Sequence, residues 1–89
     1  MENFDQLIAV LRDPANLNRQ DLLMEAARFC LAQRLFCSAD LLIRLSGISG
    51  TLKDEFIENL KASVREMKGW PFEIDGCVWL LIRGMENND

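Results

Sequence analysis

Few residues in this chain could do chemistry, and the side chain most often used for general acid–base catalysis is absent. The 89-residue sequence contains no histidine. A serine nucleophile needs a neighbouring base to activate it. No such base is evident near any of the four serines, which are Ser38, Ser46, Ser49 and Ser63. The sequence therefore gives no support to nucleophilic catalysis.

Two other patterns also have non-catalytic explanations. Glu55 and Glu58 would share one face of a helix with Lys61, as expected of a solvated surface rather than of an acid–base pair. Gly47 and Gly50 are spaced like a helix-terminating glycine and a turn glycine, not like a phosphate-binding loop. We expect a protein that is not an enzyme and that binds no cofactor.

The three cysteines do not form a metal-binding pattern. Cys30, Cys37 and Cys77 have no CxxC spacing, and no histidine is available to complete a zinc site. Thiols of this kind are typical of buried residues in a reducing compartment. The sequence predicts no metal site and a cytoplasmic location.

Charge and hydropathy exclude further classes. The formal net charge is −4 and the pI about 4.7, which disfavours nucleic acid, because a phosphate backbone attracts a basic surface. The first residues are acidic, unlike a secretory signal peptide. No apolar run approaches the roughly 20 residues of a transmembrane helix. We expect one domain over residues 1–89, with a frayed tail at 86–89 and no membrane insertion.

Apolar spacing predicts helices along the chain. Asn3 is a candidate N-cap for a first helix that ends before Pro14. Its apolar residues recur at the spacing of an amphipathic helix, at Phe4, Leu7, Ile8 and Leu11.

Two more helices are expected at 19–36 and 39–46. Asn18 and Ser38 are their candidate N-caps, and Gly47 ends the later one. The helix at 19–36 is apolar over most of its circumference, which predicts neighbours on more than one side.

A fourth helix is expected at 52–68, capped by Thr51, with charged residues on its outer face. The segment 77–82 is apolar throughout and could be a buried strand. A helix is favoured, because no other segment offers a strand for it to pair with. Asp75 would open this last element.

A short sequence repeat supports the prediction of an all-helical fold. Leu-Leu-Ile-Arg occurs at 41–44 and again at 80–83, as expected of stacked helical hairpins. The fold predicted is all-α, with about five helices in stacked antiparallel hairpins, and is tetratricopeptide-like although the strict tetratricopeptide consensus is absent. Such repeats usually bind another chain.

Residues 22–86 resemble the YscG/PscG family, whose members are small tetratricopeptide-like co-chaperones of the type III secretion needle subunit. The matching positions are Glu25-Ala26, the segment 39–46, Trp70-Pro71, Asp75, Cys77, Trp79, Leu80, Leu81 and Arg83-Gly84. The resemblance implies a cytoplasmic virulence chaperone that forms a heterodimer with a second small chaperone. It also implies that the pair grips the amphipathic C-terminal helix of the needle subunit and keeps it monomeric until export. This chain ends soon after Trp79, where longer members continue, so the family's last hairpin is expected to be missing or very short.

Two apolar surfaces are candidates for partner binding. The last helix is apolar almost all round with little chain left to cover it, and the helix at 19–36 has a face that could line a groove for an amphipathic helix. The partner-binding residues predicted are Met24, Leu31, Leu35, Val78, Trp79 and Ile82. Two alternatives remain: Trp79 is simply core, or Val78, Trp79 and Ile82 form the symmetric interface of a structural homo-oligomer.

Overall fold

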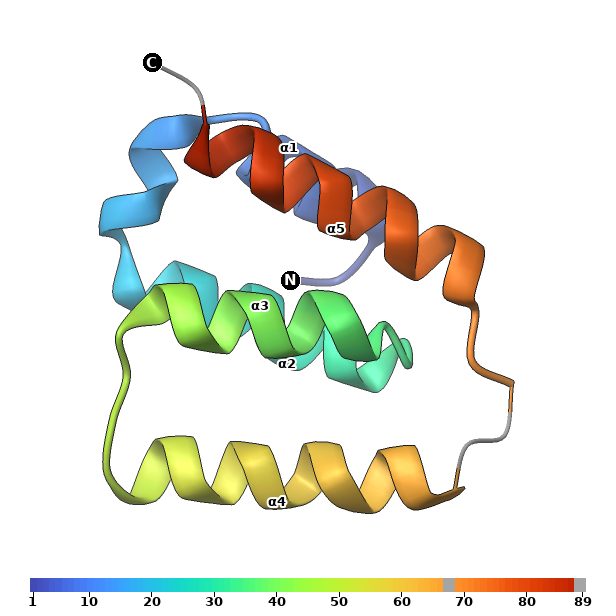
Figure 1. The fold of residues 1–89 in the computed structure, drawn as a ribbon. Coiled ribbons are helices and arrows are strands. Elements are labelled where there is room, and N and C mark those ends of the chain that lie inside the picture. The colour runs from blue at the N-terminus through green and yellow to red at the C-terminus, as the bar shows by residue number, and fades with distance from the viewer. Residues whose placement is uncertain (67–68, 88–89) are drawn as a thin grey trace.

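The computed structural model describes residues 1–66 and 69–87, and every regular element in them is helical (Figure 1). The elements in chain order are α1 (Phe4–Leu11), the short 3₁₀ helix η1 (Pro14–Asn18), α2 (Gln20–Ala32), α3 (Phe36–Ser46), α4 (Thr51–Glu66) and α5 (Phe72–Glu86). The all-α prediction is confirmed. The segment 77–82 lies within α5, so the choice of helix over strand was right.

The helices form three layers around the α2–α3 hairpin (Figure 1). α2 and α3 run antiparallel and pack along each other. α4 packs against α3 on one side of this hairpin, while α5 and α1 pack together on the opposite side, with α5 against α3. The hairpin arrangement thus has one feature that the sequence did not indicate: α5 does not follow α4 in the stack but crosses to the far side of α3.

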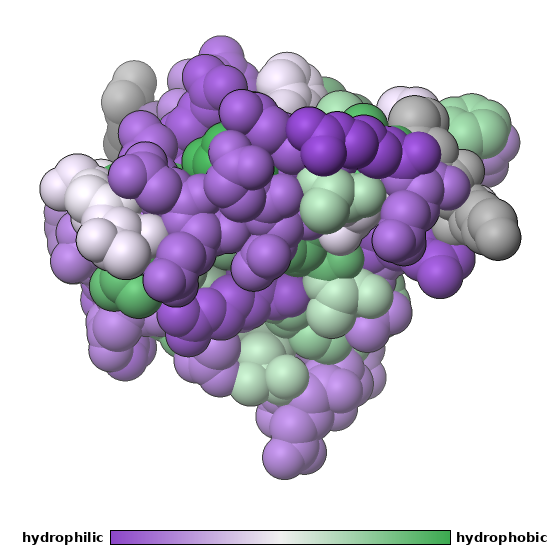
Figure 2. Space-filling view, turned by 90° about the horizontal axis from the view of Figure 1, so that it is seen from below, coloured by the Kyte–Doolittle hydropathy of each residue, from purple (hydrophilic) through white to green (hydrophobic). Residues whose placement is uncertain are grey.

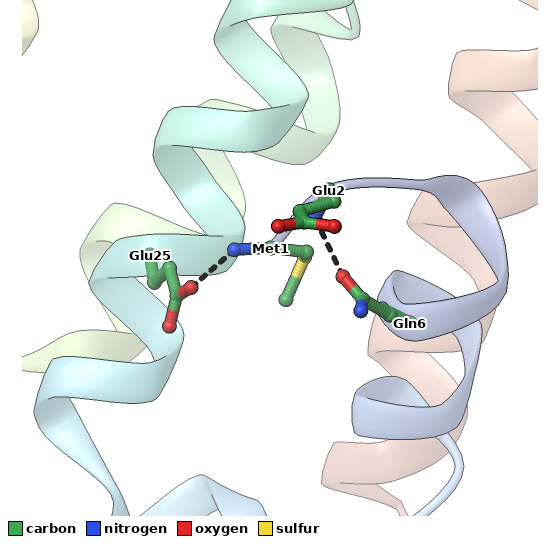
Figure 3. A network of polar contacts seen from close by, with 4 residues as sticks. All are labelled: Met1, Glu2, Gln6 and Glu25. Carbon is green, nitrogen blue, oxygen red and sulfur yellow. Dashed lines mark hydrogen bonds and ion pairs between the residues drawn. The ribbon is translucent and has the colours of Figure 1, made fainter.

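Hydrogen bonds and an ion pair connect the N-terminal segment to α1 and α2. The Asn3 side chain accepts a hydrogen bond from the Gln6 backbone N–H at 2.9 Å, which confirms the predicted N-cap. The Gln6 side chain in turn accepts from the backbone N–H of Glu2, and the Met1 ammonium group pairs with the Glu25 carboxylate on α2 (Figure 3).

The turn between α2 and α3 corrects two predicted boundaries. Instead of one helix over 19–36, α2 ends at Ala32, and α3 begins at Phe36 rather than at 39. Arg34 adopts a left-handed conformation with φ of 64°, and the Leu35 N–H donates to the Cys30 carbonyl at 2.8 Å. This is the hydrogen-bond pattern of a Schellman motif, here with arginine at the position that glycine usually occupies.

The start of α3 depends on a residue from another helix. Leu35, at the N-cap position, offers no side-chain acceptor. Asp75, in the first turn of α5, accepts from the backbone N–H groups of Cys37 at 2.8 Å and Ser38 at 2.9 Å. The Ser38 hydroxyl, predicted to cap α3, instead donates to the Asp75 carbonyl at 3.0 Å. Asp75 is fully buried, and Trp70 Nε1 donates to it at 3.0 Å as a third partner.

Two other helix starts differ from the prediction, and one predicted helix end is confirmed. Arg19, not Asn18, is the N-cap position of α2, and Thr51 is already the first residue of α4. Gly47 ends α3 with φ of 72°, as predicted. The predicted last residues of α4, 67–68, and the end of the tail, 88–89, lie outside the described residues.

The core lies where α2, α3 and α5 meet α1. Its most completely buried apolar residues are Leu7, Leu11, Leu23, Ala26, Ala27, Cys30, Leu35, Ala39, Leu42, Ile43 and Ile82. α4 contributes only Phe56 and Leu60 as buried residues and is therefore the edge of the fold.

We predict that Asp75→Asn destabilises the protein by roughly 2–3 kcal/mol, because the amide group cannot accept from three donors at once and leaves at least one buried N–H unpaired. Urea unfolding with an unchanged m-value would measure the loss. Asp54→Asn is the control, since Asp54 is an exposed acid in the first turn of α4 and should change stability by less than about 0.5 kcal/mol. Equal effects of the two substitutions would contradict the structural role of Asp75.

Candidate helix-binding groove

A shallow groove lies between α2 and α4. One wall is a stripe on α2 at helical spacing, formed by Met24, Arg28, Leu31 and Ala32. The facing stripe on α4 consists of Leu52, Glu55, Phe56 and Asn59. Met24 and Phe56 are nearly buried, whereas Leu52 is 54% exposed. The groove therefore has an apolar floor, and the apolar residues Leu52 and Ala32 of its lining remain open to solvent.

The groove continues at both ends. Towards the start of α2, Met24, Arg28 and Leu52 border a second hollow, whose other residues are Gln20, Asp21, Gly47, Ile48 and Ser49. Towards the end of α2, Leu31 and Ala32 border a third hollow, whose other residues are Arg34, Phe36, Ser63 and Glu66. Because neighbouring hollows share lining residues, the three lie in a row along α2, and we call this row the channel.

Charge is divided between the two rims. Arg28 and Arg34 lie on the α2 side, where Asp21 is the one acidic residue among the described lining residues, whereas Glu55 and Glu66 lie on the α4 side. Asp54 and Glu58 line a further hollow on α4, which extends the acidic rim. Seen from the side of α4, the surface is mainly hydrophilic, with hydrophobic residues showing between the polar ones (Figure 2).

The structure separates the six residues predicted to bind a partner. Met24 and Leu31 line the groove; Leu31 is partly exposed, whereas Met24 is a buried core residue that forms part of the groove floor. Leu35, Val78 and Ile82 are buried in the core, so their side chains are not accessible to a partner in this structure. For them, the structure corrects the expectation of a surface position.

Trp79 lies at the surface of α5. It is 37% exposed, and the Arg83 guanidinium lies 5.6 Å from the centre of its ring. The alternative that Trp79 is simply core therefore does not match the structure. Its neighbour Leu80 is 65% exposed, so part of the apolar surface of α5 is uncovered, as expected.

The sequence did not indicate the α4 side of the groove. Leu52 and Phe56 have the i, i+4 spacing of one apolar stripe on the helix expected at 52–68, although only Phe56 of the two reaches the core. The available signal was position, because Leu52 lies in the first turn of α4, at the end of its apolar stripe.

The thiols show no activated cysteine. Burial, reinforced by the negative charge of Asp75, raises the pKa of the Cys30 thiol to about 12. Partial burial also raises the pKa of Cys37, with Asp75 and Asp40 adding to the effect. Both shifts oppose formation of the nucleophilic thiolate. Within residues 1–66 and 69–87, no three His, Cys, Asp or Glu side chains lie together as a metal site requires.

Among the helices described here, none combines the length and apolar character needed to cross a bilayer. Comparison with protein-family models, curated proteins and solved structures finds no significant match. The resemblance to the needle co-chaperones stays a prediction from the sequence.

We predict that the three cysteines of the native protein react with a thiol reagent in the order Cys77, Cys37, Cys30. Cys77 is exposed, and the raised pKa of Cys37 slows its reaction although it too is exposed. Cys30 is inaccessible and should react only on unfolding. Mass spectrometry after timed alkylation at pH 8 would give the order, and rapid labelling of Cys30 in the native state would contradict its place in the core.

The raised pKa of Cys30 also predicts a pH dependence of stability. Between about pH 9 and 12 the unfolded chain loses the Cys30 proton while the folded chain keeps it. The free energy of unfolding should therefore fall with rising pH, by at most about 1.4 kcal/mol per pH unit from this thiol. Cys30→Ala should reduce the slope in urea titrations. A slope equal to that of the native chain would refute the assignment.

Proposed function

We propose that this protein is a chaperone or adaptor that binds an amphipathic helix in the groove between α2 and α4. The observation that carries the proposal is the row of hollows with an apolar floor, open at Leu52, beside α2 and α4, two helices that run in the same direction (Figure 1). Grooves of this kind hold helices by their apolar stripe.

The dimensions support a helical occupant. α2 has 13 residues, so at 1.5 Å per residue the channel beside it is roughly 20 Å long. A partner helix of three to four turns, on the order of 14 residues, would span this length. Its apolar residues at i, i+3, i+4 and i+7 would lie over Met24, Leu31 and Phe56 and cover Leu52.

The rims favour one charge arrangement in the partner. Basic residues along the edge that faces α4 would lie beside Glu55 and Glu66, and acidic residues along the other edge would lie beside Arg28. Because rim charges act more on specificity than on affinity, we expect them to set the orientation of the helix.

The resemblance to the YscG/PscG family suggests the particular partner. Within our proposal, the helix belongs to the needle subunit of a type III secretion system, and binding takes place in the cytoplasm together with a second small chaperone. Covering the apolar stripe of a self-assembling helix blocks its polymerisation, which is the physical basis of such a role. A homo-oligomer remains the second candidate, favoured by the uncovered surface of α5.

We predict that Leu52→Asp weakens binding of an amphipathic helix at least about tenfold, because it places a charge on the apolar contact. The probe is a synthetic helical peptide of about 14 residues with an apolar stripe, lysines on one edge and glutamates on the other. Fluorescence anisotropy would measure its affinity. Leu80→Asp is the matched control, a similarly exposed leucine on α5 that should leave binding unchanged.

Equal binding by both variants, or no binding of the peptide by the native chain, would refute the groove as the site. The needle-subunit partner is tested separately by co-expressing this chain with a needle subunit and its second chaperone. A stoichiometric complex lost in Leu52→Asp is expected. If the peptide binds in the groove but the needle subunit forms no complex, the groove stands and the secretion role fails.

A further inference from the structure

A second exposed apolar surface lies on the outer side of α5 and on the segment that leads into it. Of the six large hydrophobic residues exposed in the described part of the chain, five lie between 70 and 80. Phe72 is 62% and Leu80 65% exposed. In Figure 1, α5 lies on the opposite side of the α2–α3 hairpin from α4, so this surface is distinct from the groove.

The residues on the outer face of α5 are arranged symmetrically along the helix. Its buried face carries Asp75, Val78, Ile82 and Met85. At 100° per residue, the opposite face carries Glu73, Gly76, Leu80 and Arg83, all of them exposed. This stripe is symmetric about position 78. Glu73 and Arg83 lie equally far before and after it along the chain, and Gly76 and Leu80 do so too.

An antiparallel second copy of the helix matches this stripe. With the two-fold axis at position 78, each Leu80 faces Gly76 of the other copy. Each Glu73 likewise faces the other copy's Arg83. Both contacts occur twice, as a two-fold symmetric interface requires. The charges are complementary only in this antiparallel orientation, since a parallel pair would place like charges together.

No contact among the described residues requires a glycine at position 76. A Cβ atom at Gly76 would meet nothing within 4 Å, and its φ is not in the left-handed region. Glycine inside a helix costs about 1 kcal/mol relative to alanine. A close approach by the leucine of another copy would offset that cost.

The charged residues are available for such a contact. Glu73 forms no ion pair with any described residue. Arg83 makes a 3.4 Å contact with Glu86, and its side chain is 45% exposed, so this intramolecular pair is weak.

We propose that the outer face of α5 is a self-association surface, on which two copies of this chain pair antiparallel through Glu73, Gly76, Leu80 and Arg83. A contact made mainly by one helix from each copy falls at the low end of interface areas. The dimer therefore dissociates on dilution, with a Kd on the order of micromolar.

Sedimentation velocity over a range of protein concentrations tests the proposal. The native chain should shift from monomer to dimer, whereas Leu80→Asp should stay monomeric. Gly76→Leu should also prevent association, although it raises helix propensity and therefore should not unfold the monomer. Leu52→Asp is the control on the other surface and should dimerise like the native chain.

Charge reversal identifies the register. Arg83→Glu should weaken the dimer about tenfold, and combining it with Glu73→Arg should restore the native Kd, because the pair is re-formed with exchanged signs. Cys77 lies next to the proposed axis and is exposed. In the Cys37→Ser variant, a short bismaleimide should therefore link two chains through Cys77.

A chain that stays monomeric at every concentration would overturn the proposal. The partner of the outer face of α5 would then be a different protein. A dimer unaffected by Leu80→Asp would overturn it as well. A dimer that Arg83→Glu weakens but Glu73→Arg does not rescue would contradict the antiparallel register. None of these results bears on peptide binding in the groove, so the two proposals fail independently.

Discussion

The contact between Asp75 and the start of α3 is the interaction on which the arrangement of the helices depends. The first N–H groups of a helix need acceptors, and those of α3 have no local side chain to provide them. A buried carboxylate needs hydrogen-bond donors, since without them its burial would be costly. One contact meets both needs, and the Trp70 indole adds a donor from the segment before α5. It places the beginning of α5 against α3, on the side away from α4.

This constraint explains which helix boundaries could be predicted from the sequence. The amphipathic stripe of α1 and the ends marked by Asn3 and Gly47 are local signals, and they were predicted correctly. The start of α3 was not, because its cap lies 37 residues away from Ser38 along the chain. The end of α2 was missed for a related reason: arginine occupies the left-handed position where glycine would have marked a stop.

The same constraint explains the errors in the predicted binding residues. A helix that is apolar all round does not reveal which face is buried. Asp75 determines the orientation of α5, because residues three, seven and ten positions later must then point inward. These are Val78, Ile82 and Met85, all of which are buried. Two of them had been assigned to a partner, while the exposed Leu80 on the other face had not.

On α2, the wide apolar surface supplies both core residues and part of the groove lining. Met24 and Leu31 line the groove beside α4, but Met24 also belongs to the core, and Leu35, in the turn after α2, is completely buried. The contribution of α4 depends on where it packs, which its own periodicity does not reveal.

The position of α5 also determines how α4 is held. Because α5 packs on the far side of α3, α4 has neighbours on one side and buries only Phe56 and Leu60. An element with so few buried contacts is expected to open locally at lower cost than the core. A helix bound in the groove would cover Leu52 and add apolar contacts to α4, so binding and the ordering of α4 favour each other. A dimer formed through α5 would leave both grooves facing outward, and each copy could hold a helix without separating from the other.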